Sequence, residues 1–229
     1  FVLQFALLFI GMESGMPPGL ASVLMQSQVF FTIVFAAVAL GERPRARHLV
    51  GMVIAAAGIV AIGASVGGQG SDMTWLGLAL VLTASACWAV GNVIMRGVGP
   101  VEFLPMTVWM SLVAPLPLLA VSLLVEGPGA VADALSQWSW RGAGSIVFQG
   151  AVATLAGYGL WAHLLRRYPA SLVAPYSLLV PVFGIVSSAI MFGERFGVLR
   201  LFGMALILVG IAVVALPTKR FARKPSAAS

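Results

Sequence analysis

A glycine-flanked serine is the first feature of this sequence that could support chemistry. Segment 63–67, G-A-S-V-G, fits the pattern G-x-S-x-G, and Asp133 and His163 follow in the chain order of a hydrolase triad. A nucleophile elbow needs a strand, a sharp turn and a helix, whereas Ser65 ends an apolar run at a glycine-rich loop. The membrane topology derived below puts Ser65 and His163 near opposite faces. The motif therefore predicts no enzyme.

Metal and cofactor chemistry finds no support in the sequence either. His48 and His163 lack partners at ligand spacing. The single cysteine, Cys87, excludes an internal disulfide framework and is expected to pack inside an apolar segment. We expect no metal site and no cofactor.

Carboxylates avoid the centres of the apolar segments. All seven acids lie in loops or at segment ends: Glu13, Glu42, Asp72, Glu102, Glu126, Asp133 and Glu194. A proton-coupled carrier commonly uses an acid near mid-membrane, and this stretch offers none. Glu42 and Glu194 each precede an arginine. The sequence leaves three roles undecided for both: an ion pair, a helix cap or a gate.

Amide and aromatic side chains do occur inside the apolar segments. The five candidates for binding a solute are Gln26, Trp88, Asn92, Tyr158 and Tyr176. Amides can bond a carboxylate or an ammonium group, and aromatic faces attract cations. These residues predict part of the lining of a site for a small zwitterionic metabolite. Hydrogen bonding between packed helices explains such residues as well.

Composition sets the environment in which these residues act. The 229 residues are 60% hydrophobic and 9% charged, with a mean hydropathy of +1.04. A soluble domain carries about 25% charged residues, so a lipid bilayer is the expected surrounding. The net charge of +6 is spread over short loops and the tail rather than one face, which predicts no nucleic-acid partner.

Eight apolar stretches bounded by turn-forming residues predict an all-α, polytopic membrane bundle. Backbone groups in lipid must bond within their own segment, so each stretch should be a helix. The predicted spans are 1–13, 18–40, 47–66, 74–96, 102–125, 143–165, 170–192 and 198–216. Connection 126–142 predicts a short interfacial helix with Trp138 and Trp140 as aromatic anchors.

Lysine and arginine alternate between rich and poor loops. About ten of the 13 basic residues fall on one side: Arg43, Arg45, Arg47, Arg96, Arg166, Arg167, Lys219, Arg220, Arg223 and Lys224. The rich side of a membrane protein is cytoplasmic. We expect a multi-pass protein of the inner membrane with a cytoplasmic C-terminus and a basic tail at 217–229.

The chain repeats itself at an offset of 152 residues. The tripeptide G-E-R at 41–43 recurs at 193–195, and the pair Gly51 and Gly58 recurs as Gly203 and Gly210. About five spans separate the copies, so the second copy is inverted, as in many secondary transporters. The first copy ends near residue 66, and the second covers 74–216. The offset further predicts about 80 residues with two more helices before Phe1, giving ten in all.

Three segments carry a resemblance to a known family. They are M-P-P-G-L-A-S-V-L-M-Q-S-Q-V-F-F-T at 16–32, S-A-C-W-A-V-G-N at 85–92, and V-A-P-Y-S-L-L-V-P-V-F-G at 173–184, followed by G-E-R at 193–195. They resemble the EamA family of the drug/metabolite transporter superfamily, and most closely its O-acetylserine/cysteine exporters. The resemblance runs from Phe1 to about Leu216. It implies ten helices in two inverted repeats and export of amino acids or related metabolites by alternating access.

Two other functional classes stay open from the sequence. One is a carrier for a different solute, such as a drug, a sugar or a nucleotide-linked metabolite, the last of which would favour a strongly cationic cavity. The other is a membrane protein that transports nothing, which leaves the inverted repeat unexplained. The sequence indicates no particular coupling ion or oligomeric state.

Overall fold

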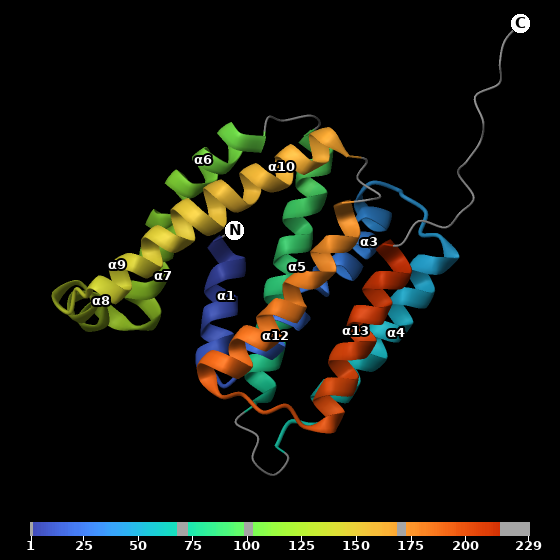
Figure 1. Cartoon of the computed structure of the whole chain (residues 1–229), viewed down its shortest axis with the longest axis horizontal. Coiled ribbons are helices and arrows are strands. Elements are labelled where there is room, and N and C mark those ends of the chain that lie inside the picture. Colours follow the sequence, from blue (N-terminus) through green and yellow to red (C-terminus); the bar gives the residue numbers. More distant parts are fainter. Residues whose placement is uncertain (1, 68–72, 99–102, 169–172, 216–229) are drawn as a thin grey trace, which may run out of the picture.

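The regular elements are helices throughout the part of the chain that the computed structural model describes, residues 2–67, 73–98, 103–168 and 173–215 (Figure 1). Their bounds are α1 Val2–Glu13, α2 Pro18–Met25, α3 Gln28–Ala39, α4 Ala46–Gly63, α5 Trp75–Val98, α6 Phe103–Val113, α7 Pro115–Val125, α8 Gly127–Ser136, α9 Trp140–Val147, the π-helix η1 Phe148–Ala156, α10 Gly157–Arg167, the 3-10 helix η2 Ala174–Leu178, α12 Leu179–Phe192 and α13 Val198–Ala215.

Five segments of the described chain are long and apolar enough to cross a membrane. They are Pro18–Ala39, Ala46–Gly63, Trp75–Val98, Val108–Val125 and Val198–Ala215, and the apolar helices Val2–Glu13 and Tyr176–Phe192 are shorter. The predicted all-helical membrane bundle is confirmed. Predicted span 143–165 lies within the run of helices from Trp140 to Arg167, whose middle is the π-helix.

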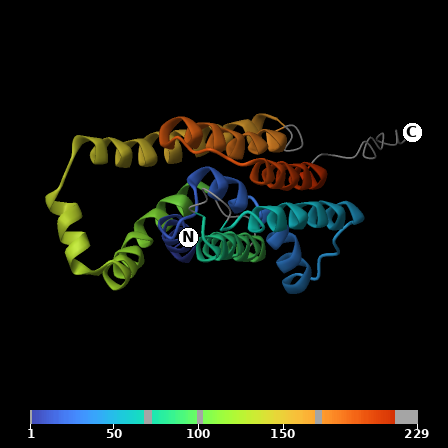
Figure 2. The same ribbon diagram turned by 90° about the horizontal axis from the view of Figure 1, so that it is seen from below.

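Two groups of helices differ in how they pack. Helices α1 to α5, α12 and α13 form the main bundle, whose core includes Leu20, Val81 and Ile207. Helices α6 to α9 extend to one side of it (Figures 1 and 2), and most of their large apolar side chains are exposed. The expected short helix in 126–142 is α8, and Trp138 and Trp140 after it are 66% and 90% exposed.

Helices α4 and α13, which the 152-residue offset relates, pack closely against each other. A Cβ built on Gly58 would lie 2.6 Å from the Gly203 carbonyl oxygen, and one on Gly203 would lie 2.7 Å from the Gly58 oxygen. Gly51 meets Gly210 in the same way. Rising numbers on α4 face falling numbers on α13, so the helices are antiparallel. Each contact is also the image of the other under the 152-residue offset, as in a two-fold interface.

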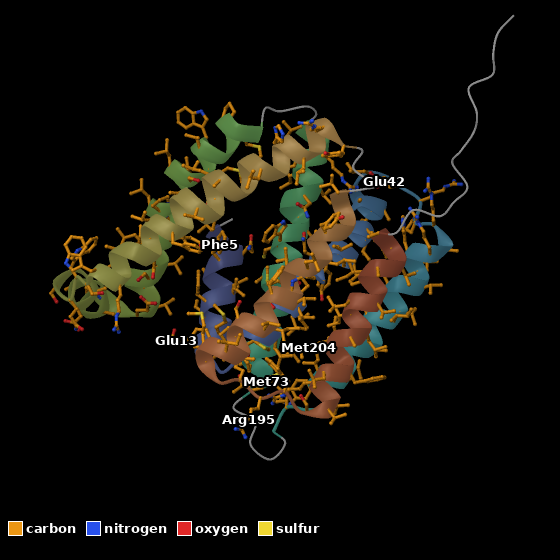
Figure 3. The ribbon with its side chains drawn as sticks, viewed as in Figure 1. Phe5, Glu13, Glu42, Met73, Arg195 and Met204 are labelled. Atoms are coloured by element: carbon orange, nitrogen blue, oxygen red, sulfur yellow. The ribbon has the colours of Figure 1, made fainter. Side chains whose placement is uncertain are left out.

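The loops before these helices therefore lie at opposite ends of the bundle. Figure 3 labels Glu42 at one end and Arg195 with Met73 toward the other. We call these the Glu42 end and the Glu194 end. Gly41 and Gly193 both have φ of 67°, a left-handed conformation that favours glycine and ends the preceding helix.

Both copies of the preceding span are interrupted at the same repeat position. The first copy breaks between α2 and α3 at Gln26 and Ser27, although the sequence predicts one span over 18–40. The second copy changes from η2 to α12 between Leu178 and Leu179, which is the same point shifted by 152 residues. Discontinuous helices at related positions are common at the binding sites of repeat-built transporters.

Candidate functional site

A cavity among the described residues opens at the Glu42 end. Its volume is about 380 Å³, and residues of α3, α4, α5, the end of α13 and the loop after α3 line it. The lining residues are Gln28, Val29, Thr32, Ile33, Glu42, Arg43, Pro44, His48, Asn92, Arg96 and Val214. The volume falls within the range of small-molecule sites, about 300–1,000 Å³.

Three neutral polar side chains form the inner part of this cavity. Asn92 Nδ2 on α5 donates to Gln28 Oε1 at 2.8 Å and to Thr32 Oγ1 at 3.2 Å, both on α3. Thr32 Oγ1 in turn donates to the Gln28 carbonyl oxygen at 2.6 Å. We call Gln28, Thr32 and Asn92 the amide cluster. Within the described residues, the hydrogen bonds of these amides use Asn92 Nδ2 and Gln28 Oε1, which leaves the Asn92 Oδ1 acceptor and the two N–H donors of Gln28 Nε2 for a solute.

Charged groups surround the mouth of the cavity. Arg96 Nη1 lies 3.2 Å from Glu42 Oε2, and both side chains are 53% exposed. His48 accepts from the Arg45 backbone N–H at 3.3 Å, which anchors it in the first turn of α4. Arg43 also lines the mouth. A polar solute leaving water would meet these charges before the neutral amides.

The Glu194 end is packed shut. The Gly19 backbone N–H, in the first turn of α2, donates to Ser188 Oγ at 3.1 Å and to Glu194 Oε2 at 3.2 Å. A Cβ on Gly184 would lie 2.5 Å from Ser22 Oγ, so α2 and α12 touch along their length. Apolar side chains seal the neighbouring space, where Met16 is 1% exposed.

The five predicted site residues are placed in different parts of the bundle. Asn92 lines the cavity. Trp88 lies one turn from it on the same face of α5 and is partly buried, and Gln26 is partly buried at the break between α2 and α3. Tyr176 on η2 is 63% exposed. The backbone of Tyr158 belongs to α10, and its side chain lies outside the described part of the structure.

Several cavity residues escaped the candidate list drawn from the sequence. Gln28 and Thr32 stand at i and i+4 on one helix face, which is a visible signal, but nothing local links that face to Asn92, 60 residues or more away. For Glu42 the sequence left an ion pair, a helix cap or a gate open, and Arg96 carried only topological information. Their common side of the membrane was predictable, whereas their pairing was not.

The serine motif has a structural role. Ser65 Oγ donates to the Ile62 carbonyl oxygen at 2.7 Å and accepts from Arg200 Nε at 3.2 Å. It thereby ties the end of α4 to the start of α13. Among the described residues, no three His, Cys, Asp or Glu side chains are grouped so that they could hold a metal ion.

Known proteins resemble this chain over nearly its whole length. Residues 1–64 and 75–216 match the model of the EamA-like transporter family. A protein of Salmonella typhimurium named "Probable amino-acid metabolite efflux pump" is 39% identical over 92% of this chain and 71% of its own length. A protein of the same name from Escherichia coli is 37% identical over the same shares.

More distant relatives extend the comparison. A protein of Streptantibioticus cattleyicolor named "Probable terminal-alkyne amino-acid exporter" is 26% identical over 88% of this chain and 65% of its own length. No solved structure matches the chain. Two stretches that fit one family model, near relatives at 39% and 37% identity and a bundle of apolar helices lead to one conclusion: the chain belongs to the EamA-like transporter family and is a multi-pass membrane transporter rather than an enzyme.

Proposed function

We propose that this protein exports amino acids or closely related small metabolites by alternating access. The names of the relatives from Salmonella typhimurium and Escherichia coli support the solute class. The observation that carries the mechanism is the difference between the two ends of the bundle. A cavity of about 380 Å³ reaches the amide cluster from the Glu42 end, while Gly19, Ser188 and Glu194 pack together at the other.

The cavity suits a small molecule with balanced charge. Its inner part holds amides and a hydroxyl, which can bond both an ammonium and a carboxylate without a fixed net charge. The charges at the mouth are of both signs, so a zwitterion can be attracted without being trapped. We extend the proposed path from Asn92 to Trp88, Gln26, Tyr158 and Tyr176, which become exposed to solute in other states of the cycle.

The bias of basic residues supports the direction. Arg43, Arg45, Arg47 and Arg96 all lie toward the Glu42 end, which makes that end cytoplasmic. Helix α13 ends beside the first turns of α4, so the end of α13 is then cytoplasmic as well. In this proposal the protein lies in the inner membrane. The state described here is then open to the cytoplasm and takes up solute from it.

Export assays on cells that produce the protein as its gene encodes it test this function. Metabolites in the medium are measured with and without the protein, and for the variants Asn92→Leu and Gln28→Leu. Both variants should lose export while keeping normal membrane levels. The matched control is Thr83→Val, which removes an exposed hydroxyl from the same helix α5. No rise of any amino-acid metabolite in the medium would overturn the proposal, and normal export by both leucine variants would remove the amide cluster from the path.

One observation favours a second solute class. Arg43 and Arg96 lie at the mouth with one carboxylate, Glu42, beside the neutral His48, whose ring accepts a hydrogen bond. Such an excess of positive charge also suits an anionic metabolite. Profiling the same media for organic acids and phosphorylated metabolites distinguishes the two, because a carrier for anions raises those species and leaves amino acids unchanged.

A further inference from the structure

Two glutamates that the repeat makes equivalent stand in different surroundings. Glu42 and Glu194 are related by the 152-residue offset, and each follows a glycine with φ of 67°. Glu194 contacts the first turn of another helix, whereas Glu42 is half-exposed and pairs with Arg96 at the mouth of the cavity. The same tripeptide, G-E-R, therefore lies at the closed end of the bundle in one repeat and at the open end in the other.

The contact of Glu194 has the features of a helix cap supplied by another part of the chain. Pro17 and Pro18 lead into α2, and neither can donate, so Gly19 offers the first free backbone N–H of that turn. A carboxylate is favoured there by the positive end of the helix. A Cβ on Gly19 would lie 2.8 Å from Glu194 Oε2, so any larger residue here would force that carboxylate to shift.

The repeat indicates what a closed Glu42 end would look like. Shifted by 152 residues, the contact between Ser22 on α2 and Gly184 on α12 becomes a contact between η2 and Thr32 on α3. In this structure Thr32 instead lines the cavity and bonds Asn92. Closing the Glu42 end thus amounts to packing η2 against α3 as α2 now packs against α12.

We propose that Glu42 and Glu194 are alternating latches of the transport cycle. Glu194 holds the Glu194 end shut in the state described here. When that end opens, Glu194 releases α2, and Glu42 leaves Arg96 to hold its own end shut on the helix pair formed by α3 and η2. The exchange rests on the alternating access proposed above. The latch proposal goes beyond alternating access, because it names the carboxylate that holds each end closed.

Neither glutamate contact stabilises its state strongly. A transport cycle requires such weak contacts, because both states must be reached. Glu194 Oε1 is buried and bonds no group of the described residues, so the closed contact carries a desolvation cost. The Glu42 pair is half-exposed, and such pairs add little stability. Each contact can therefore be given up at small cost, which keeps both states populated.

A cysteine that lines the cavity reports which end is open. Val29 lines the cavity on α3, so Val29→Cys is placed in a Cys87→Ala background of the protein as its gene encodes it. The rate of reaction with an impermeant thiol reagent is measured in open membrane fragments, where both faces are reachable. Ser136→Cys, exposed at the end of α8, gives the reference rate for an unhindered thiol.

Opposite shifts are expected for the two latches. Glu194→Gln destabilises the state described here and should slow labelling of the cysteine at 29, on the order of two- to fivefold, as expected for loss of one charge at a helix N-terminus. Glu42→Gln destabilises the opposite state and should speed labelling. Ser188→Ala removes the other acceptor of the Gly19 N–H and should act like Glu194→Gln, more weakly. Asp133→Asn, an exposed acid on α8, should change nothing.

Shifts in the same direction for both glutamine variants, or no shift for Glu194→Gln at normal expression, would overturn the latch. Normal expression and an unchanged size-exclusion profile separate a change of state from misfolding, since the reference cysteine at 136 reports only the rate of an unhindered thiol. Labelling needs no transported solute. A wild-type protein that exports nothing but shows the opposite shifts therefore contradicts the proposed function alone, and one that exports without them contradicts the latch alone.

Discussion

Gly51 and Gly210 pack backbone against backbone, so that a Cβ on either would lie 2.6 Å from the carbonyl oxygen of the other. No flexible side chain can yield at that contact, because the opposing atom belongs to the main chain. The same arrangement recurs seven residues along α4, and together the two contacts set the spacing of α4 and α13. Small residues let helices approach in this way in a bilayer, where packing replaces the hydrophobic effect.

Gly51→Ala and Gly210→Ala should each destabilise the protein by about 1–3 kcal/mol, the usual cost of forcing a methyl group into a packed contact. Thermal unfolding in detergent, followed by size-exclusion chromatography, measures the change. Gly91→Ala is the matched control, because Gly91 is a helical glycine on α5 with no neighbouring atom within 4 Å. Equal midpoints for all three variants would contradict the interface.

Cysteines at Ala46 and Val198 should respond to opposite sides of the membrane. The two residues begin α4 and α13, are both exposed, and occupy equivalent repeat positions in antiparallel helices. Each cysteine is placed in a variant without Cys87. In intact cells that produce these variants, an impermeant thiol reagent should label the cysteine at 198 and spare the one at 46. Permeabilised cells give the control, in which both react. Equal labelling of the two in intact cells would refute the inversion.

Ser27→Ala should leave the protein as stable as before or more stable, by up to about 1 kcal/mol. Ser27 Oγ is buried at the break between α2 and α3 and has no hydrogen-bond partner among the described residues. Removing an unsatisfied buried hydroxyl relieves a desolvation cost. Thr32→Val is the comparison, since Thr32 Oγ1 makes two hydrogen bonds and its loss should destabilise. A fall in the unfolding midpoint of Ser27→Ala would mean that this hydroxyl has a partner.

A double-mutant cycle between Glu42 and Arg96 should yield a coupling free energy below about 1 kcal/mol, because both side chains are half-exposed and water screens the pair. The unfolding midpoints of Glu42→Gln, Arg96→Gln and the double variant give the value. High salt should reduce it further. A coupling of several kcal/mol would show that the pair is a structural link, which could not be exchanged during transport.

The sequence predicts the helices well because an apolar run of sufficient length has one stable form in lipid. Predicted spans 47–66 and 198–216 correspond to α4 and α13 within a few residues. The break at Gln26 and Ser27 was not predicted, since no proline or glycine stands there to signal it.

The candidate site was only partly predictable. Asn92 was chosen because a buried amide needs several partners, and the structure supplies Gln28 and Thr32. Periodicity within one helix reports which residues share a face, but it does not report which face of another helix they meet. Such pairings depend on the packing of the whole bundle, and Glu42 with Arg96 is a second example.

The tight pairing of α4 with α13 also sets an order of assembly. Gly51 precedes its repeat partner Gly203 by 152 residues. At a synthesis rate of about 5–20 residues per second, α4 enters the membrane roughly 8 to 30 seconds before α13 does. Throughout that interval the glycine face of α4 must contact lipid or another helix in place of α13. The bundle therefore stays unlocked until α13 is inserted, and chains released before that point lack the contact that joins α4 to α13.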